Sequence, residues 1–306
     1  MTRVKLLPLI LVLVILLCAC GKSETVLTVG GEEISYDTYR YFYLNYKAEN
    51  PEYTEEQLYQ KSVDAISSDV ALTLLAKTHD VGLNKTEKKS VDDYVEAAVA
   101  NYGGKDAYSE ALQNNNLTDA LFRHFYSQQL LENKLREYIY LEMNDLIKSD
   151  DKTVEADIQK NFMAAKQVLI RHDNGQSNEK NKATAEDILK KAQNGEAFDA
   201  LIKEYSEDTT AVTDYTYYFT YGQMVEGFEK AVSDTEVGKI CDYVAESEAG
   251  YHVVLRMPLD PEYVDSHFEE LRNAYKARCF NEMRNTLAES FEIVKSKDFD
   301  SLDFNE

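Results

Sequence analysis

Few residues of this 306-residue chain have the types and spacings that catalysis or metal binding requires. The sequence has no glycine-rich phosphate loop, no serine or cysteine in a nucleophile elbow, and no cluster of metal ligands. His79 and His124 occur singly, and we interpret both as surface or packing residues. The sequence therefore predicts neither a metal nor a cofactor.

The residues best suited to form a site lie between about 164 and 257. They belong to three fragments: "KQVLIRH", "NGEAFDALIKEYSED" and "YGQMVEGFEKAV", the last followed further on by "GYHVVLRM". Met224 and Phe228 are four residues apart in a predicted short helix, so they share one of its faces. Two apolar side chains in this arrangement line either a binding pocket or a plain core. The aromatic run "TDYTYYFTY" before them is open to the same two interpretations.

The elements that position these residues change in character along the chain. The run "VLTV", the pair Gly30-Gly31 and Ser35 predict a short strand, a turn and a helix N-cap. Apolar residues spaced by three and four then predict helices from about 54 to "DVGLN", 86 to 102, 105 to 113 and 118 to 145. Short β-type runs alternate with helices between about 160 and 260, so this segment is α+β.

A long apolar stripe characterises the segment after Pro261. Its members are spaced by three or four residues: Val264, Phe268, Leu271, Tyr275, Cys279, Met283 and Leu287. Such a stripe must be buried, and the helical first half offers the obvious surface. We therefore expect residues 261–306 to fold back on that half, with the α+β segment inserted between them. The final "FEIVKSKDFDSLDF" is a candidate for a strand that pairs with "VLTV".

The first twenty residues have the layout of an export signal. Arg3 and Lys5 precede an apolar run from Leu6 to Leu17, which is shorter than a typical transmembrane helix. The sequence "LCACG" that follows resembles a bacterial lipobox, which implies that Cys20 is lipidated and becomes the mature N-terminus. An ordinary signal peptide that happens to contain cysteines is the alternative.

Composition and charge narrow the class of protein further. With 44% hydrophobic residues the chain is long and apolar enough for two compact domains. Its formal charge of −22 becomes −24 if Arg3 and Lys5 are removed with the signal, so nucleic acid is excluded as a partner. Of the remaining cysteines, Cys241 and Cys279 are expected to be small buried hydrophobic residues.

The three fragments resemble, in order and spacing, the parvulin family of peptidyl-prolyl cis-trans isomerases. The most specific matches are Gly222-Gln223-Met224, Phe228, Gly238 and Gly250-Tyr251-His252. The lipobox, the helical first half and the helical tail resemble the extracytoplasmic foldases of the PrsA and SurA type. The resemblance implies an α+β fold, in which both chain ends form a bowl-shaped, mostly helical chaperone domain. A parvulin-like domain, a small antiparallel sheet flanked by helices, is inserted into it.

The resemblance also implies four segments with distinct roles. Residues 1–20 are the lipoprotein signal peptide, and residues 21–160 form the N-terminal chaperone-like domain. Residues 161–260 form the parvulin-like domain, and residues 261–306 form a C-terminal helix that packs back on the N-terminal domain. The partners implied are unfolded exported polypeptides with Xaa-Pro segments and, through Cys20, the extracytoplasmic face of the cell membrane; a homodimer is left open.

Proline isomerisation requires little chemistry. The Xaa-Pro bond has a barrier of roughly 18 to 20 kcal/mol, because rotation breaks amide resonance. An apolar pocket that excludes water lowers that barrier without a nucleophile. By the resemblance, Met224, Phe228 and Phe219 line the proline pocket, Gln223 lies beside them, and Asp208 lies beside the twisting bond. His252 corresponds to the second of two histidines that share a hydrogen-bond network under the site.

The chain departs from the family pattern at two places. Gln167 occupies the position of the first histidine, so the network keeps a donor and an acceptor but loses a proton relay. The family's Gly-Gly-Asp-Leu-Gly stretch is replaced by residues 213–217, "TDYTY", which places Thr216 where a leucine closes the pocket.

Three hypotheses follow. The first is a lipid-anchored isomerase and foldase for exported proteins, with Asp208, His252 and Gln167 as polar residues. The second is a holdase chaperone with a non-catalytic parvulin domain. The third, a solute-binding lipoprotein, ranks last because strands and helices do not alternate over the length that such a domain needs.

Overall fold

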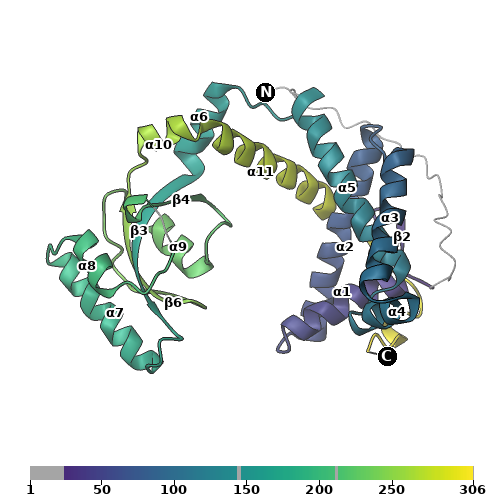
Figure 1. Ribbon diagram of the computed structural model, residues 1–306, viewed down its shortest axis with the longest axis horizontal. Helices are drawn as coiled ribbons and strands as arrows, with labels where there is room; N and C mark the ends of the chain where they lie inside the picture. The colour runs from purple at the N-terminus through teal and green to yellow at the C-terminus, as the bar shows by residue number, and fades with distance from the viewer. Residues whose placement is uncertain (1–23, 143–145, 211–212, 306) are drawn as a thin grey trace. The chain divides into compact units, whose positions relative to one another are not determined.

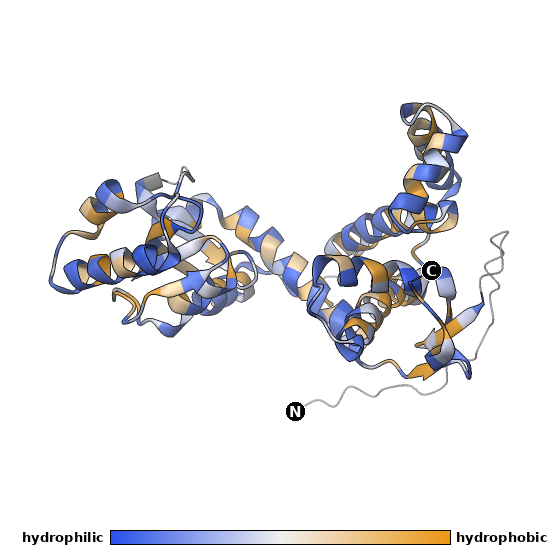
Figure 2. Cartoon of the chain, turned by 90° about the horizontal axis from the view of Figure 1, so that it is seen from below, coloured by the Kyte–Doolittle hydropathy of each residue, from blue (hydrophilic) through white to orange (hydrophobic). Residues whose placement is uncertain are grey.

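The computed structural model describes residues 24–142, 146–210 and 213–305 (Figure 1). The predicted signal peptide and Cys20 lie outside these residues. Contacts divide the chain into two compact units, one made of Met1–Ile147 with Lys276–Glu306 and the other of Lys148–Tyr275. The helices of both units carry hydrophilic and hydrophobic residues side by side along their length, as amphipathic helices do (Figure 2).

The first unit is mostly helical and contains a three-stranded sheet. From the N-terminal segment it takes β1 (Thr25–Val29), β2 (Glu32–Ser35), α1 (Tyr36–Glu49), α2 (Glu55–Thr78), α3 (Lys85–Asn101), α4 (Lys105–Asn114) and α5 (Asp119–Glu142). From the C-terminal segment it takes the end of α11 (Phe268–Glu289), β7 (Ile293–Lys295) and the short 3-10 helix Phe299–Ser301. The sheet order is β2-β1-β7, and Leu27 lies opposite Lys295. The pairing of the C-terminal strand with "VLTV" is thereby confirmed.

Local sequence signals explain where these helices begin. Ser35 is the N-cap of α1, as predicted, and its side chain accepts a hydrogen bond from the Thr38 backbone N–H. Thr54 and Asn84 form capping boxes with Gln57 and Glu87 at the starts of α2 and α3.

Residues from both chain ends share the core of the first unit. Tyr39 of α1 is buried, and its ring centroid lies 4.6 Å from that of Phe304 and 5.0 Å from that of Phe299. Val26 and Val29 of β1 belong to the same cluster. The aromatic face of α1 is therefore core rather than an exposed platform.

The second unit contains a four-stranded antiparallel sheet. Its elements are α6 (Asp151–Asn161), β3 (Phe162–Arg171), α7 (Asn178–Gln193), α8 (Phe198–Tyr205), the 3-10 turn Thr213–Tyr215, β4 (Tyr217–Thr220), α9 (Glu226–Asp234), β5 (Ala245–Ser247), β6 (Gly250–Met257) and α10 (Pro261–Ser266). The strand order is β4-β3-β6-β5, so the two long strands β3 and β6 lie at the centre.

Helices cover both faces of this sheet. Val168 and Ile170 of β3 and Val253 of β6 pack against α7 and α8 on one face. Met163 and Ala165 of β3 alternate with them and pack against α9 on the other face (Figure 1). Cys241 is buried in this second cluster, as predicted, whereas Cys279 on α11 is only half-buried.

The apolar stripe after Pro261 is divided between the two units. Its first members, Val264, Phe268, Leu271 and Tyr275, pack against Val154 and Ile158 of α6 within the second unit. Only the later part of α11 packs on the first half of the chain, where Phe280 is buried and lies 4.3 Å from the Arg136 guanidinium. The expectation that the whole stripe covers the first half is therefore wrong, because α6 offers the nearer apolar surface.

Candidate active site

Five polar side chains on one face of the second unit's sheet form a continuous hydrogen-bonded chain. Gln167 Nε2 donates to Asp208 Oδ2 at 2.7 Å, and Gln167 Oε1 lies 2.6 Å from His252 Nδ1. His252 Nε2 lies 2.7 Å from Ser247 Oγ, and the Tyr217 hydroxyl donates to Asp208 Oδ2 at 2.5 Å. The structure thus brings together the three predicted polar site residues and adds Ser247 and Tyr217.

The strand register places these residues. Leu169 of β3 lies opposite His252 of β6, so Gln167 is the diagonal neighbour of His252 on the same face of the sheet. Ala245 of β5 also lies opposite His252, which makes Ser247 the diagonal neighbour on the other side. The alternation within β5 is the sequence signal that could have identified Ser247.

Asp208 is held by the loop that follows α8. The backbone N–H of the preceding residue, Glu207, donates to the Leu169 carbonyl at 2.8 Å and ties the loop to β3. The Thr210 backbone N–H donates to Asp208 Oδ1 at 2.9 Å. The carboxylate therefore has donors for both of its oxygens.

Gln167 determines which ring nitrogen of His252 carries the proton. The Asp208 carboxylate only accepts hydrogen bonds, so the amide nitrogen of Gln167 must face it and the amide oxygen must face His252. That oxygen accepts from His252 Nδ1–H, which leaves His252 Nε2 to accept from the Ser247 hydroxyl. Glutamine thus preserves control of the tautomer, although it cannot relay a proton.

Burial and hydrogen bonding set the charges in this chain. Burial lowers the pKa of His252 to about 4, so this imidazole is neutral at pH 7. Burial alone would raise the pKa of Asp208, but hydrogen bonds from Tyr217, Thr210 and Gln167 outweigh it and lower that pKa, which keeps the carboxylate ionised. Burial and the bond to Asp208 raise the pKa of Tyr217 to about 12.

The predicted pocket residues form an apolar cluster beside this chain. Phe219 and Phe228 are 0% and 2% exposed, and their ring centroids are 5.5 Å apart. The Phe228 ring centroid lies 5.7 Å from that of His252, so the cluster and the polar chain adjoin. Tyr217, Met224 and Val225 are only partly buried and pack against the cluster. These three side chains therefore form a partly exposed edge of the cluster.

The prediction that Met224 and Phe228 lie on one helix is wrong. Helix α9 begins at Glu226, and Val225 is its extended N-cap with φ −62° and ψ 137°. Gly222 has φ +82° and turns the chain just after β4, so Met224 reaches the cluster from this turn rather than from the helix.

The remaining predicted residues lie at the edge of the site. Thr216 is partly exposed and is not a member of the apolar cluster; its neighbour Tyr217 packs there instead. Gln223 is exposed, and its side-chain oxygen accepts from the Thr220 backbone N–H at 2.9 Å, which stabilises the turn. In the stretch that replaces the family's glycine-rich one, Asp214 and Tyr215 adopt φ of 50° and 58°, a region that side chains disfavour.

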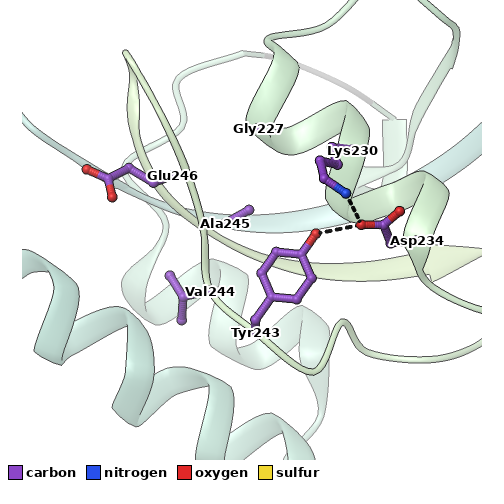
Figure 3. A pocket seen from close by; sticks show the side chains of 7 residues that line it. All are labelled: Gly227, Lys230, Asp234, Tyr243, Val244, Ala245 and Glu246. Atoms are coloured by element: carbon purple, nitrogen blue, oxygen red, sulfur yellow. Dashed lines mark hydrogen bonds and ion pairs between the residues drawn. The ribbon is translucent and has the colours of Figure 1, made fainter.

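A separate surface pocket of about 390 Å³ lies between α9 and the segment leading to β5 (Figure 3). The residues that line it are Gly227, Lys230, Asp234, Tyr243, Val244, Ala245 and Glu246, none of which was predicted as a site residue. Lys230 Nζ lies 2.6 Å from Asp234 Oδ2, and the Tyr243 hydroxyl donates to the same oxygen at 3.1 Å. Three of its four polar side chains are thus already paired with one another.

The described residues contain no group of three or more side chains that could hold a metal ion. His124, which was expected to be a simple surface or packing residue, lies 2.7 Å through Nε2 from Asp69 Oδ2 and joins α5 to α2. None of the described helices combines the length and apolar character that crossing a bilayer needs.

Comparison with known proteins identifies the class of this domain. Residues 146–256 match the model of the PPIC-type PPIase domain, so the second unit contains a parvulin-type peptidyl-prolyl isomerase domain. The match includes all five residues of the polar chain.

Similarity to known proteins extends over most of the chain. The chain is 27% identical to foldase protein PrsA 1 of Listeria monocytogenes over 258 residues. This alignment covers 83% of this chain and 76% of that protein. The chain is 24% identical over 254 residues to foldase protein PrsA of Geobacillus kaustophilus, covering 82% and 77%. The crystal structure of PrsA from Bacillus anthracis aligns with a TM-score of 0.36 and 23% identity over 74% of this chain and 94% of that one. The chain thus contains a PPIC-type PPIase domain and is similar to PrsA foldases over most of its length.

Proposed function

We propose that this protein isomerises Xaa-Pro bonds in unfolded exported polypeptides and assists their folding, and that Cys20 anchors it to the extracytoplasmic face of the cell membrane. The observation that carries the catalytic part is the Asp208 carboxylate, which Gln167 and Tyr217 hold by hydrogen bonds next to the apolar cluster that Met224 covers. An ionised group and an apolar surface side by side are what a twisting prolyl amide requires.

The proposed mechanism needs no covalent step. Resonance in a planar amide places negative charge on its oxygen, so a carboxylate near that oxygen disfavours the planar form relative to the twisted one. An apolar surface around the prolyl ring excludes the water that stabilises the planar amide. Asp208 supplies the first effect, and Met224 with Phe228 and Phe219 beneath it supplies the second.

His252, Gln167 and Ser247 act by holding Asp208. The neutral imidazole and the amide form a rigid bridge from Ser247 on β5 to the carboxylate in the loop after α8. Such a bridge keeps the carboxylate in one position without contributing a second charge. Thr216 and Gln223, at the edge of the site, are proposed to contact the peptide on either side of the proline.

The anchor rests on the N-terminal sequence. A positive start, a short apolar run and "LCACG" together favour lipidation at Cys20. The negative charge of the rest of the chain disfavours direct adsorption to anionic lipids, which makes a covalent acyl group the better means of attachment.

A holdase without isomerase activity is the second candidate. It is favoured by one observation, namely that Phe219 and Phe228 are buried beneath Tyr217 and Met224. If that cover stays closed, the domain is a scaffold only.

Isomerase activity of the chain from Gly21 onward separates the two candidates. NMR exchange on a panel of Xaa-Pro peptides detects weak catalysis, and Asp208→Ala is measured alongside the wild type. Catalysis that falls in the variant is the expected result. A folded wild-type sample that suppresses aggregation of an unfolded client but leaves the exchange rate unchanged would instead establish the holdase.

A further inference from the structure

Tyr217 connects the two halves of the proposed site. It is the first residue of β4, two positions before Phe219, so both side chains lie on the face of the sheet that α9 covers. Its ring packs edge-on against Phe228 with centroids 6.1 Å apart. Its hydroxyl, at the other end of the side chain, donates to Asp208 Oδ2 at 2.5 Å.

This position gives Tyr217 a large share of the cover over the cluster. Phe219 and Phe228 are buried, while Tyr217 is one of the three partly buried side chains packed against them. A prolyl ring that is to contact Phe228 and approach Asp208 must enter the space that the phenol ring fills. The bond to the ionised carboxylate holds the ring there, because hydrogen bonds to charged groups are among the stronger ones.

We propose that Tyr217 is the gate of the proline pocket: its ring occupies the place of the prolyl ring until substrate displaces it and breaks its bond to Asp208. This inference rests on the proposed function, in the part that places a binding pocket for Xaa-Pro segments at this site. The gate has two consequences for binding. Only the open fraction of molecules binds substrate, so the apparent affinity is reduced by that fraction. Opening also withdraws one donor from Asp208, which leaves the carboxylate free to face the substrate amide.

Two substitutions separate the ring from its tether. Tyr217→Phe keeps the ring but removes the bond to Asp208, and Tyr217→Ala removes both. The matched control is Tyr218→Ala, because Tyr218 follows directly on β4 but lies on the opposite face, stacked 3.6 Å from the Tyr263 ring. General damage to β4 affects all three variants, whereas gating affects only the two at position 217.

The experiment measures the dissociation constant of an Ala-Ala-Pro-Phe peptide by NMR titration of the chain from Gly21, with the exchange rate taken on the same samples. The expected result is binding about tenfold tighter in Tyr217→Ala, with Tyr217→Phe between it and the wild type and Tyr218→Ala unchanged. Loss of a purely structural residue would weaken binding rather than tighten it.

Equal or weaker binding by a folded Tyr217→Ala variant, or the same gain in Tyr218→Ala, would overturn the gate. If Tyr217→Ala does not fold, Tyr217→Phe decides alone: tighter binding supports the gate and unchanged or weaker binding overturns it. Wild-type catalysis without tighter binding in either variant sinks the gate and leaves the isomerase function standing. Tighter binding without catalysis in any sample supports the gate and rejects the isomerase function. Absence of binding in all samples rejects the gate and the isomerase function together.

Discussion

Gln167, at the position of the family's first histidine, keeps the hydrogen bonds of the polar chain but not the ability to relay a proton. Its amide connects His252 to Asp208 with two short hydrogen bonds, each with its donor and acceptor in the required direction. A histidine at this position would also offer a titrating nitrogen, which the amide lacks. The network therefore holds Asp208 in place, but Gln167 cannot pass a proton between His252 and Asp208.

The buried His252 makes the stability of the protein depend on pH. Its pKa of about 4 in the folded protein lies below the ordinary value of 6.5, so between these two values only the unfolded chain binds the proton. The unfolding free energy is therefore highest above pH 6.5 and falls as the pH drops towards 4. We expect this residue to account for a loss of about 2 kcal/mol between pH 7 and pH 5.

Urea unfolding at several pH values measures this contribution. The variant His252→Asn cannot titrate, and its stability should change less over the same range. Asp208 does not contribute to the change between pH 7 and pH 5. Its pKa is lowered from 3.8, so the stability that it provides is lost only below that value. Identical pH slopes for wild type and variant would show that His252 is not the group responsible.

Met224 should matter more for activity than for folding. Its side chain is partly buried on the cluster and adjoins the proposed pocket, so Met224→Ala removes contact with a bound proline. We expect isomerase activity to fall about tenfold, while the unfolding free energy falls by less than about 2 kcal/mol. Val225→Ala is the control, since Val225 packs on the same cluster but was not predicted to bind substrate. Equal losses of activity in the two variants would make Met224 an ordinary packing residue.

At the scale of elements, the close packing of α9 on β5 positions the site. A Cβ atom added to Gly227 would lie 1.9 Å from the Glu246 carbonyl oxygen, so only glycine allows the helix to approach the strand this closely. Phe228 and Ser247, the next residues in each element, belong to the apolar cluster and the polar chain. The separation of α9 from β5 therefore sets the geometry of both parts of the site.

Gly227→Ala should destabilise the second unit despite the higher helix propensity of alanine. Propensity favours the variant by about 1 kcal/mol, but the clash with backbone atoms forces α9 away from β5 and costs about 1 to 3 kcal/mol or more. Thermal unfolding measures the net effect. Gly82→Ala is the control, because no atom lies within 4 Å of the added Cβ there. A Gly227→Ala variant as stable as wild type would mean that the two elements separate at no cost.

At the scale of the whole molecule, the chain leaves the first unit after Ile147 and returns to it at Lys276. Strand β7 completes the sheet started by β1 and β2, and Phe299 and Phe304 complete the core under α1. We therefore expect the first unit to need the C-terminal segment for folding, whereas β3 to β6 are contiguous in sequence. The domain limits at 21–160, 161–260 and 261–306 stay predictions.

Phe304→Ala tests this dependence. Phe304 is 8% exposed and contacts the ring of Tyr39, so its loss should cost the first unit about 3 to 5 kcal/mol. Hydrogen exchange should accelerate in α1 and β1 while β3 and β6 keep their protection. Val294→Ala, in the same segment but half-exposed, should leave both units unchanged. Uniform acceleration in both units would contradict separate stabilities.

The sequence by itself determined the features that depend on short-range patterns. Runs of a few residues are enough to show capping by Ser35, the periodic helices of the first half, the β-type runs of β3 and β6, and the family motif around Gly222 and His252. For the pairing of the last strand with the first, the sequence offered only a candidate, which the structure confirms. Gln167, Asp208 and His252 were predicted together from a resemblance. The sheet register brings Gln167 to His252, and the loop tied to β3 brings Asp208 to Gln167.

Tertiary structure alone decided the remaining features. Tyr217 lies 9 residues from its partner Asp208, and Gln167 lies 85 residues from its partner His252. Whether they meet depends on strand register and on how a loop is tied to β3. Tyr217 could have pointed to solvent, Met224 could have joined α9, and the stripe after Pro261 could have packed as one surface. Each outcome depends on which apolar surface is nearest in the folded protein. A short stretch of sequence does not show how close two distant segments come.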